Sequence, residues 1–95
     1  MKDNSMFHTV ATAHNEAIAR GVLSIWTVYD HPADFPNSYV ARRFEVGKHS
    51  RGIPTVTTDI VQGELQIIRE SFRHCGLTCL QRDDSDEPQI IESWL

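Results

Sequence analysis

Two stretches in the first half of the chain alternate between apolar and polar residues. They run from Leu23 to Tyr29 and from Ser38 to Val46, and both are rich in β-branched and aromatic side chains. Period-two alternation with this composition is typical of half-buried strands. One face of the second stretch carries Val40, Arg42, Phe44 and Val46. The pattern therefore predicts a pair of strands, with the valine and phenylalanine face turned toward the core.

A later stretch changes to helical spacing. Between Asp59 and Cys75 the apolar residues recur at intervals typical of one helix face. They are Ile60, Val61, Leu65, Ile68, Phe72 and Cys75. Asp59 followed three positions later by Gln62 fits a capping box, and Gly76 is a natural helix stop. The spacing predicts a helix from Asp59 to Cys75.

Two further strands are expected at Leu77 to Gln81 and at Gln89 to Leu95, separated by a polar, acidic turn. The resulting order is ββαββ. Two hairpins with a helix between them predict an α+β fold, in which a four-stranded, mainly antiparallel sheet has one helix packed on one face.

The first 21 residues show no clean apolar stripe, because His8, His14 and Asn15 interrupt it. Terminal segments stay mobile unless something docks them. We therefore expect residues 1–21 to be a poorly ordered extension, and residues 22–95 to form a single α+β domain.

Composition narrows the class of protein. The 95 residues carry a formal net charge of −4, with 40% hydrophobic and 23% charged residues, which is ordinary for a globular domain. No apolar run reaches the roughly 18 residues of a membrane span, and the first residues lack the apolar core of an export signal. With two cysteines, expected as thiols, the sequence indicates a cytoplasmic protein without a membrane segment or cofactor.

A proline-clamped loop separates the first two strands, and it belongs to a longer motif. Between Trp26 and Glu45 the chain reads W-x-x-Y-D-H-P-x-D-F-P-x-x-Y-V-A-R-R-F-E. This run resembles a signature of short, uncharacterised bacterial and phage-borne proteins. The resemblance implies a small stand-alone cytoplasmic protein, and it brings no catalytic residue because no activity is known for that group.

The loop also supplies the first candidate site, formed by Asp30, His31 and Asp34. A carboxylate beside an imidazole can orient it as a general base, and the three side chains together could bind a metal. The alternative is turn chemistry, since Asp side chains bond nearby backbone amides in loops. No nucleophile or further ligand lies close in sequence, and we favour the structural interpretation.

A second candidate is basic. Lys48, His49 and Arg51 lie in the glycine-bounded loop 47–54, shortly after Arg42 and Arg43. Such a set could bind an anion or nucleic acid, most simply above the start of the following helix. The negative net charge and the absence of P-loop spacing argue against this function.

The cysteines supply a third candidate, in which His74 and Cys75 lie close to Cys79. The spacing is not that of a zinc or redox motif, and Cys75 lies on the apolar stripe of the helix, so we favour packing and predict no metal site.

A sheet covered by a single helix leaves its second face open, with Trp26, Tyr39 and Trp94 still to be placed. Either the first residues cover that face or a partner does. We therefore expect a non-catalytic interaction or regulatory module, self-associating or binding a protein through a sheet face or edge. An anion- or nucleic-acid-binding module is the alternative, and an enzyme or metal site at the Asp30–His31–Asp34 loop is the third hypothesis.

Overall fold

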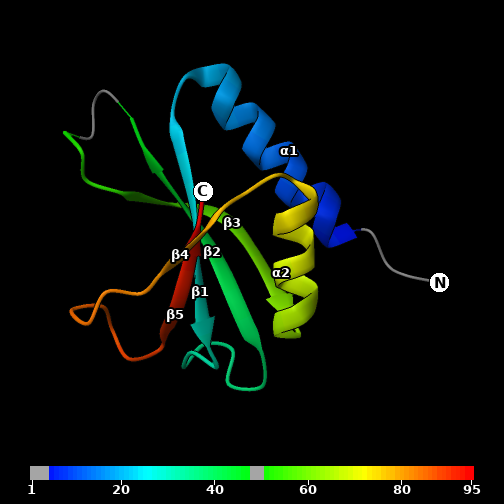
Figure 1. Cartoon of the computed structure of the whole chain (residues 1–95), viewed down its shortest axis with the longest axis vertical. Coiled ribbons are helices and arrows are strands. Elements are labelled where there is room, and N and C mark those ends of the chain that lie inside the picture. The colour runs from blue at the N-terminus through cyan, green and yellow to red at the C-terminus, as the bar shows by residue number, and fades with distance from the viewer. Residues whose placement is uncertain (1–4, 48–50) are drawn as a thin grey trace.

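The structure is a computed structural model that describes residues 5–47 and 51–95. Its elements are, in order, α1 (Ser5–Arg20), β1 (Leu23–Asp30), β2 (Tyr39–Val46), β3 (Thr55–Gly63), α2 (Leu65–His74), β4 (Cys79–Gln81) and β5 (Ile90–Trp94) (Figure 1). The predicted α+β class with an antiparallel sheet is confirmed. The predicted four strands and one helix are wrong in number, because the described residues form five strands and two helices.

The five strands form one sheet in the order β3-β2-β1-β5-β4, and every neighbouring pair is antiparallel. The hairpin of β1 and β2 pairs Leu23 with Val46 and Asp30 with Tyr39, which agrees with the predicted strands to within one residue. After β3 the chain passes through α2 from one edge of the sheet to the other. The central position of β1 thus comes from pairing with β2 on one side and β5 on the other.

The predicted helix from Asp59 to Cys75 is corrected at its start. Residues Thr55–Gly63 form β3, and α2 begins only at Leu65. The β-branched residues at the start of this stretch favour a strand over helix caps. Glu64 has extended geometry at the N-cap and makes no side-chain cap, so the predicted capping box of Asp59 does not form. Gly63 lies at the junction with φ 151°, a backbone conformation that other residues rarely adopt.

The N-terminal helix differs from the expectation of a poorly ordered extension. Val10, Ala13 and Ala17 follow one another at helical spacing and are buried against the rest of the chain. Because alanine brings little apolar area, this stripe is narrow, but it lets the helix approach the sheet closely. Gly21, with φ 74°, ends α1 in the left-handed conformation, where its N–H bonds to the Ile18 carbonyl at 3.0 Å.

Both helices pack on the same face of the sheet, which we call the helix face (Figure 1). Its core is aromatic: the ring of Phe72 from α2 lies 5.6 Å from the ring of Trp26 and 5.4 Å from that of Trp94. Trp26 and Phe72 are fully buried. The two tryptophans are therefore enclosed by the helices and are not the exposed aromatics that the sequence left unplaced.

The predicted core side of β2 is wrong. Ala41 and Arg43 lie on the helix face, opposite Val28 and Trp26 of β1. The face with Phe44 lies on the other side of the sheet.

No helix of the described residues is long and apolar enough to span a bilayer.

A buried ion pair ties α2 to the sheet. Glu92 on β5 is buried, and it accepts hydrogen bonds from Arg69 Nε at 3.0 Å and Arg69 Nη2 at 2.7 Å. The indole N–H of Trp94 donates to the same carboxylate at 2.8 Å. Burial alone would raise the pKa of Glu92, but these bonds outweigh it and lower the pKa below its usual value.

Candidate functional site

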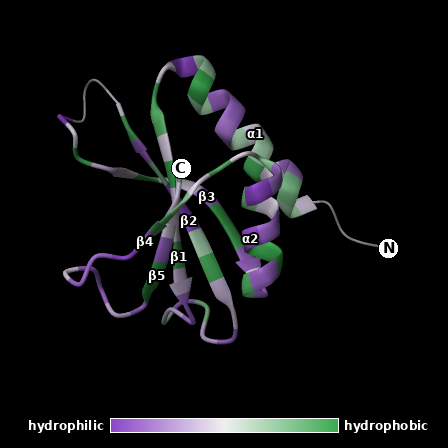
Figure 2. Cartoon of the chain, viewed as in Figure 1, coloured by the Kyte–Doolittle hydropathy of each residue, from purple (hydrophilic) through white to green (hydrophobic). Residues whose placement is uncertain are grey.

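Within residues 5–47 and 51–95, no helix covers the sheet face opposite α1 and α2, and we call it the open face. The register of the strands places side chains of all five strands on it. Its apolar and aromatic members are Leu23, Ile25, Tyr29, Val40, Phe44, Val46, Val56, Ile60, Leu80 and Ile90. Figure 2 shows the hydrophobic and hydrophilic positions along the strands. Three of these side chains, Leu23, Val56 and Leu80, are exposed, and most of the others are partly exposed. Exposed apolar patches are typical of docking sites.

The centre of the open face is hollowed. A shallow cavity of about 310 Å³ is lined by Ile25, Thr27, Tyr29, Phe44, Pro54, Ile90 and Ser93. Ile25 and Phe44 are direct cross-strand partners, and Tyr29 pairs with Ile90 on the next strand. Burial, followed by the nearby charge of Glu87, raises the pKa of the Tyr29 phenol. The hollow is thus an apolar depression with a neutral hydroxyl at its end.

One end of the open face is closed by the proline-rich loop between β1 and β2. Arg42 on this face donates a hydrogen bond to Asp34 of the loop. Pro32 is buried, and Val40 is fully buried although it belongs to a face without a helix. We conclude that the Arg42–Asp34 pair holds the loop against this end of the sheet.

On the helix face, a network of charged side chains connects the sheet to α1. Arg43 is buried, and its guanidinium lies 2.7 Å from Asp59 and 2.9 Å from Glu45. Glu45 also accepts two hydrogen bonds from Arg20 of α1, at 2.6 and 3.1 Å. These bonds, with that of Arg20 as the largest cause, lower the pKa of Glu45 to about 2. The network joins α1 to β2 and β3.

The basic residues predicted to form an anion site are distributed over different surfaces. Arg42 and Arg43 lie on opposite faces of the sheet, and each is paired with carboxylates. Arg51 is exposed and has a positive φ of 53°. Lys48 and His49 lie outside the described residues. The described part of this set is therefore not brought together.

The loop candidate is brought together only in part. His31 Nδ1 forms a hydrogen bond with Asp30, and the His31 ring packs edge-on against Tyr39 at 4.9 Å. His31 has a φ of 48°, an uncommon conformation for a residue other than glycine. Asp34 instead pairs with Arg42. An oriented imidazole is present beside a cavity of about 350 Å³, but the three predicted residues do not form one cluster.

The cysteine candidate shows packing rather than ligation. Cys75 is half-buried against the core and Cys79 is exposed, and both are free thiols. Burial raises the pKa of each thiol. His74 packs edge-on against the ring of Phe7 on α1. Among residues 5–47 and 51–95, no three His, Cys, Asp or Glu side chains are arranged to hold a metal ion.

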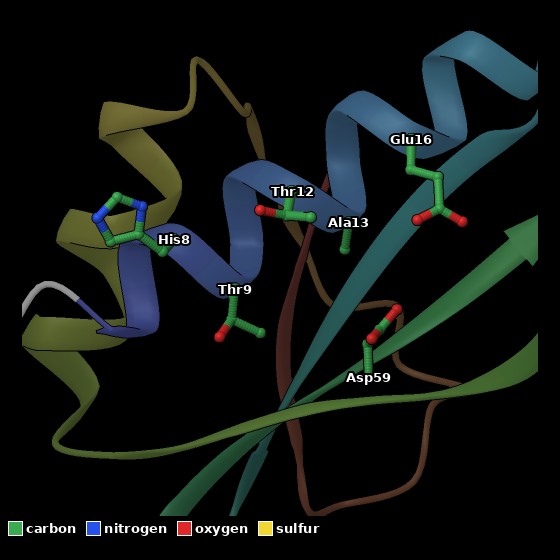
Figure 3. A pocket seen from close by; sticks show the side chains of 6 residues that line it. All are labelled: His8, Thr9, Thr12, Ala13, Glu16 and Asp59. Carbon is green, nitrogen blue, oxygen red and sulfur yellow. The ribbon is translucent and has the colours of Figure 1, made fainter.

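A groove that the sequence did not indicate runs between α1 and β3 (Figure 3). It has a volume of about 350 Å³ and is lined by His8, Thr9, Thr12, Ala13, Glu16 and Asp59. Figure 3 shows Glu16 pointing from the helix toward the strand and Asp59 pointing from the strand toward the helix. Sequence analysis missed this groove because it placed Asp59 in a helix and left the first 21 residues without order.

The sequence predicted an open sheet face, but it placed the wrong side of β2 on that face. The alternation in β2 identified its apolar side correctly, but that side was assigned to the core. Comparison with known proteins adds no name to these surfaces, since no family model, no curated protein and no solved structure matches the chain. The function must therefore be argued from the geometry.

Proposed function

We propose that this protein is a non-catalytic interaction module that self-associates by packing its open face against the open face of a second copy. The observation that carries the proposal is the uncovered, hollowed apolar surface around Ile25 and Phe44. The proposal retains the cytoplasmic location expected from the sequence.

The exposure of apolar side chains supports this choice of surface. Leu23 is 47% exposed, Val56 57% and Leu80 45%, and all three lie on the open face. Each buried square ångström of such surface contributes about 25 cal/mol to association, before the entropic cost of joining two chains. A soluble monomer gains nothing from presenting these side chains to water, whereas a dimer removes them from it.

The size of the surface fits a weak dimer. Strands lie about 4.8 Å apart and rise about 3.3 Å per residue, so three strands of eight or nine residues and the shorter β4 and β5 present a face of roughly 500 Å². Side chains that project from the sheet add to this flat area. The face is smaller than the share of about 800 Å² that each partner contributes to a standard interface, so the dimer is expected to be weak.

The charges of the open face also suit burial. Arg42 is the one formally charged strand residue among the described members of this face, and it is already paired with Asp34. Burying an unpaired charge would oppose association. Because Arg42 already has its counter-ion within the same chain, burying it costs less free energy. A second copy can therefore cover the face without supplying a counter-ion.

The exposed sheet edge is less suited to pairing between copies. β3 forms that edge, and its register shifts where residues 57–59 lie opposite Arg43. Pairing β3 with β3 of a second copy would add another Asp59 carboxylate to the same edge, and like charges oppose that pairing. The face rather than the edge is our choice for self-association.

Sedimentation velocity from about 1 to about 200 µM tests the proposal across the micromolar range of weak dimers. We expect a mass approaching twice the 10.8 kDa of one chain as concentration rises. Leu23→Glu and Val56→Glu should each weaken association by about tenfold or more, since each buries a charge in the interface. Ile18→Glu, at an equally exposed position on α1, is the matched control and should leave association unchanged. A strict monomer over the whole range, or equal effects of all three variants, would contradict the proposal.

A further inference from the structure

We infer that the groove between α1 and β3 binds an extended, basic peptide segment, which adds to the sheet as a strand beside β3 with a Lys or Arg side chain between Glu16 and Asp59. This site is separate from the open face, and it takes a different partner.

The first reason is the backbone of β3. This strand has a neighbour on one side only, β2, and no backbone hydrogen bond to another part of the described chain is formed along residues 55–63. On either side of the bulge at residues 57–59, its outer N–H and C=O groups are therefore available. An extended peptide can pair with such an edge through main-chain hydrogen bonds, with specificity supplied by alternate side chains.

The second reason is the position of α1, which packs beside this edge strand. At one end, the methyl group of Met6 lies 3.4 Å from where a Cβ on Gly63 would be. At the other end, Arg20 bonds to Glu45, which is the cross-strand partner of Thr55. The helix thus forms a wall beside β3, and the groove of Figure 3 lies between them.

The third reason is the chemistry of the groove wall. Thr9 and Thr12 offer hydroxyl groups, while Glu16 and Asp59 face one another from opposite sides of the groove. The Glu16 side chain forms an ion pair with Arg20 at 3.6 Å, but it remains accessible because it is 67% exposed. Asp59 gives one oxygen to Arg43 and stays about one-third exposed. A cation between these two carboxylates would be attracted by both.

The same charges select against a second copy at this edge. β3 contains no Lys or Arg, and Asp59 is its one charged residue. Pairing β3 with β3 of another copy would add acidic side chains to a groove that already holds two carboxylates. A partner strand with a basic residue brings the opposite charge, so the groove discriminates between the two occupants.

Selection from a phage-displayed library of random decapeptides tests the inference with the full chain. We expect the enriched peptides to share a Lys or Arg at one position and to form an alternating strand pattern. A selected peptide, labelled with fluorescein, is then titrated by anisotropy. Thr12→Lys, which places a positive charge in the groove, should weaken binding by about tenfold or more, and Asn15→Lys, which adds the same charge at an exposed α1 position outside the groove lining, should leave it within about twofold.

Amide chemical shifts locate the peptide. We expect the largest changes along β3 and the facing turns of α1, with no change on β4. Absence of enrichment over the bare support, equal binding to the Thr12→Lys and Asn15→Lys variants, or shifts centred on the open face would each overturn the inference. Concentration-dependent shifts of β3 without peptide would assign the edge to a second copy and would overturn it as well.

Discussion

Arg43 donates its Nε proton to Asp59 across a β-bulge, with 2.7 Å between the nitrogen and the carboxylate oxygen. The bulge makes this contact because residues 57–59 of β3 lie opposite a single residue of β2. Thr57 repairs the ladder there: its hydroxyl donates to the Arg43 carbonyl at 3.0 Å and accepts from the Asp59 N–H at 3.1 Å. The irregularity thus positions a carboxylate for a guanidinium that is almost completely buried.

Breaking this pair should destabilise the chain. Asp59→Ala is expected to lower the free energy of unfolding by about 2 to 4 kcal/mol, because it leaves the buried Arg43 with Glu45 as its remaining carboxylate. Urea denaturation measures the loss. Combining it with Arg43→Met should recover much of the stability, since the double variant buries no unpaired charge. A double variant that is less stable than Asp59→Ala would contradict this explanation.

Truncating the aromatic centre should cost more. Phe72→Ala removes the ring between Trp26 and Trp94 and is expected to lower the free energy of unfolding by about 3 to 5 kcal/mol. Ile67→Ala, on the same helix but 41% exposed, is the control and should cost far less. Similar losses for the two variants in chemical denaturation would show that α2 does not cover the sheet as described.

Introducing a charge beneath α1 tests whether that helix is docked. Val10 is fully buried, so Val10→Asp should detach α1 or unfold the chain, with loss of helical circular dichroism and of amide protection in α1. Asn15→Asp, at an exposed position of the same helix, should change neither measurement substantially. Unchanged protection in the Val10→Asp variant would show that α1 contributes little to the fold.

Acid should weaken the network around Glu45. Its pKa falls to about 2 in the folded chain from an ordinary value of 4.5, so its ionised form favours folding above pH 4.5. This contribution, about 3 kcal/mol at most, is lost progressively as the pH falls from 4.5 toward 2. Urea unfolding at pH 7, 4.5 and 3 should show the decline. Glu45→Gln should be less stable at neutral pH and should decline less over the same interval.

The strands that the sequence predicted correctly are those whose alternation has one interpretation. In β1 and β2, aromatic and β-branched residues recur with period two and are bounded by turn residues, so position and pairing followed. The helix predicted around Ile60 and Val61 was wrong because two adjacent apolar residues fit both a helix and a strand. Tertiary pairing with β2 decides for the strand.

The core side of β2 could not be obtained from that strand alone. Its more apolar face, with Phe44, is the open face, while Ala41 and Arg43 lie under the helices. The small alanine leaves room for the rings of Trp26 and Phe72. Arg43 is tolerated because Asp59 of β3 and Ser24 of β1 supply partners in addition to Glu45 of its own strand. Such compensation depends on residues distant in sequence, so a single-strand pattern cannot indicate it. The α1–β3 groove was missed on the same ground.

The central place of β1 has a consequence for how the chain acquires its structure. β1 pairs with β5, which is separated from it by about sixty positions of the sequence. During synthesis the hairpin of β1 and β2 can form early, but one flank of its middle strand waits for residues 90–94 to be made. Until then, Trp26 lacks Trp94 on its neighbouring strand. The sheet is therefore expected to be completed only after residues 90–94 have been made.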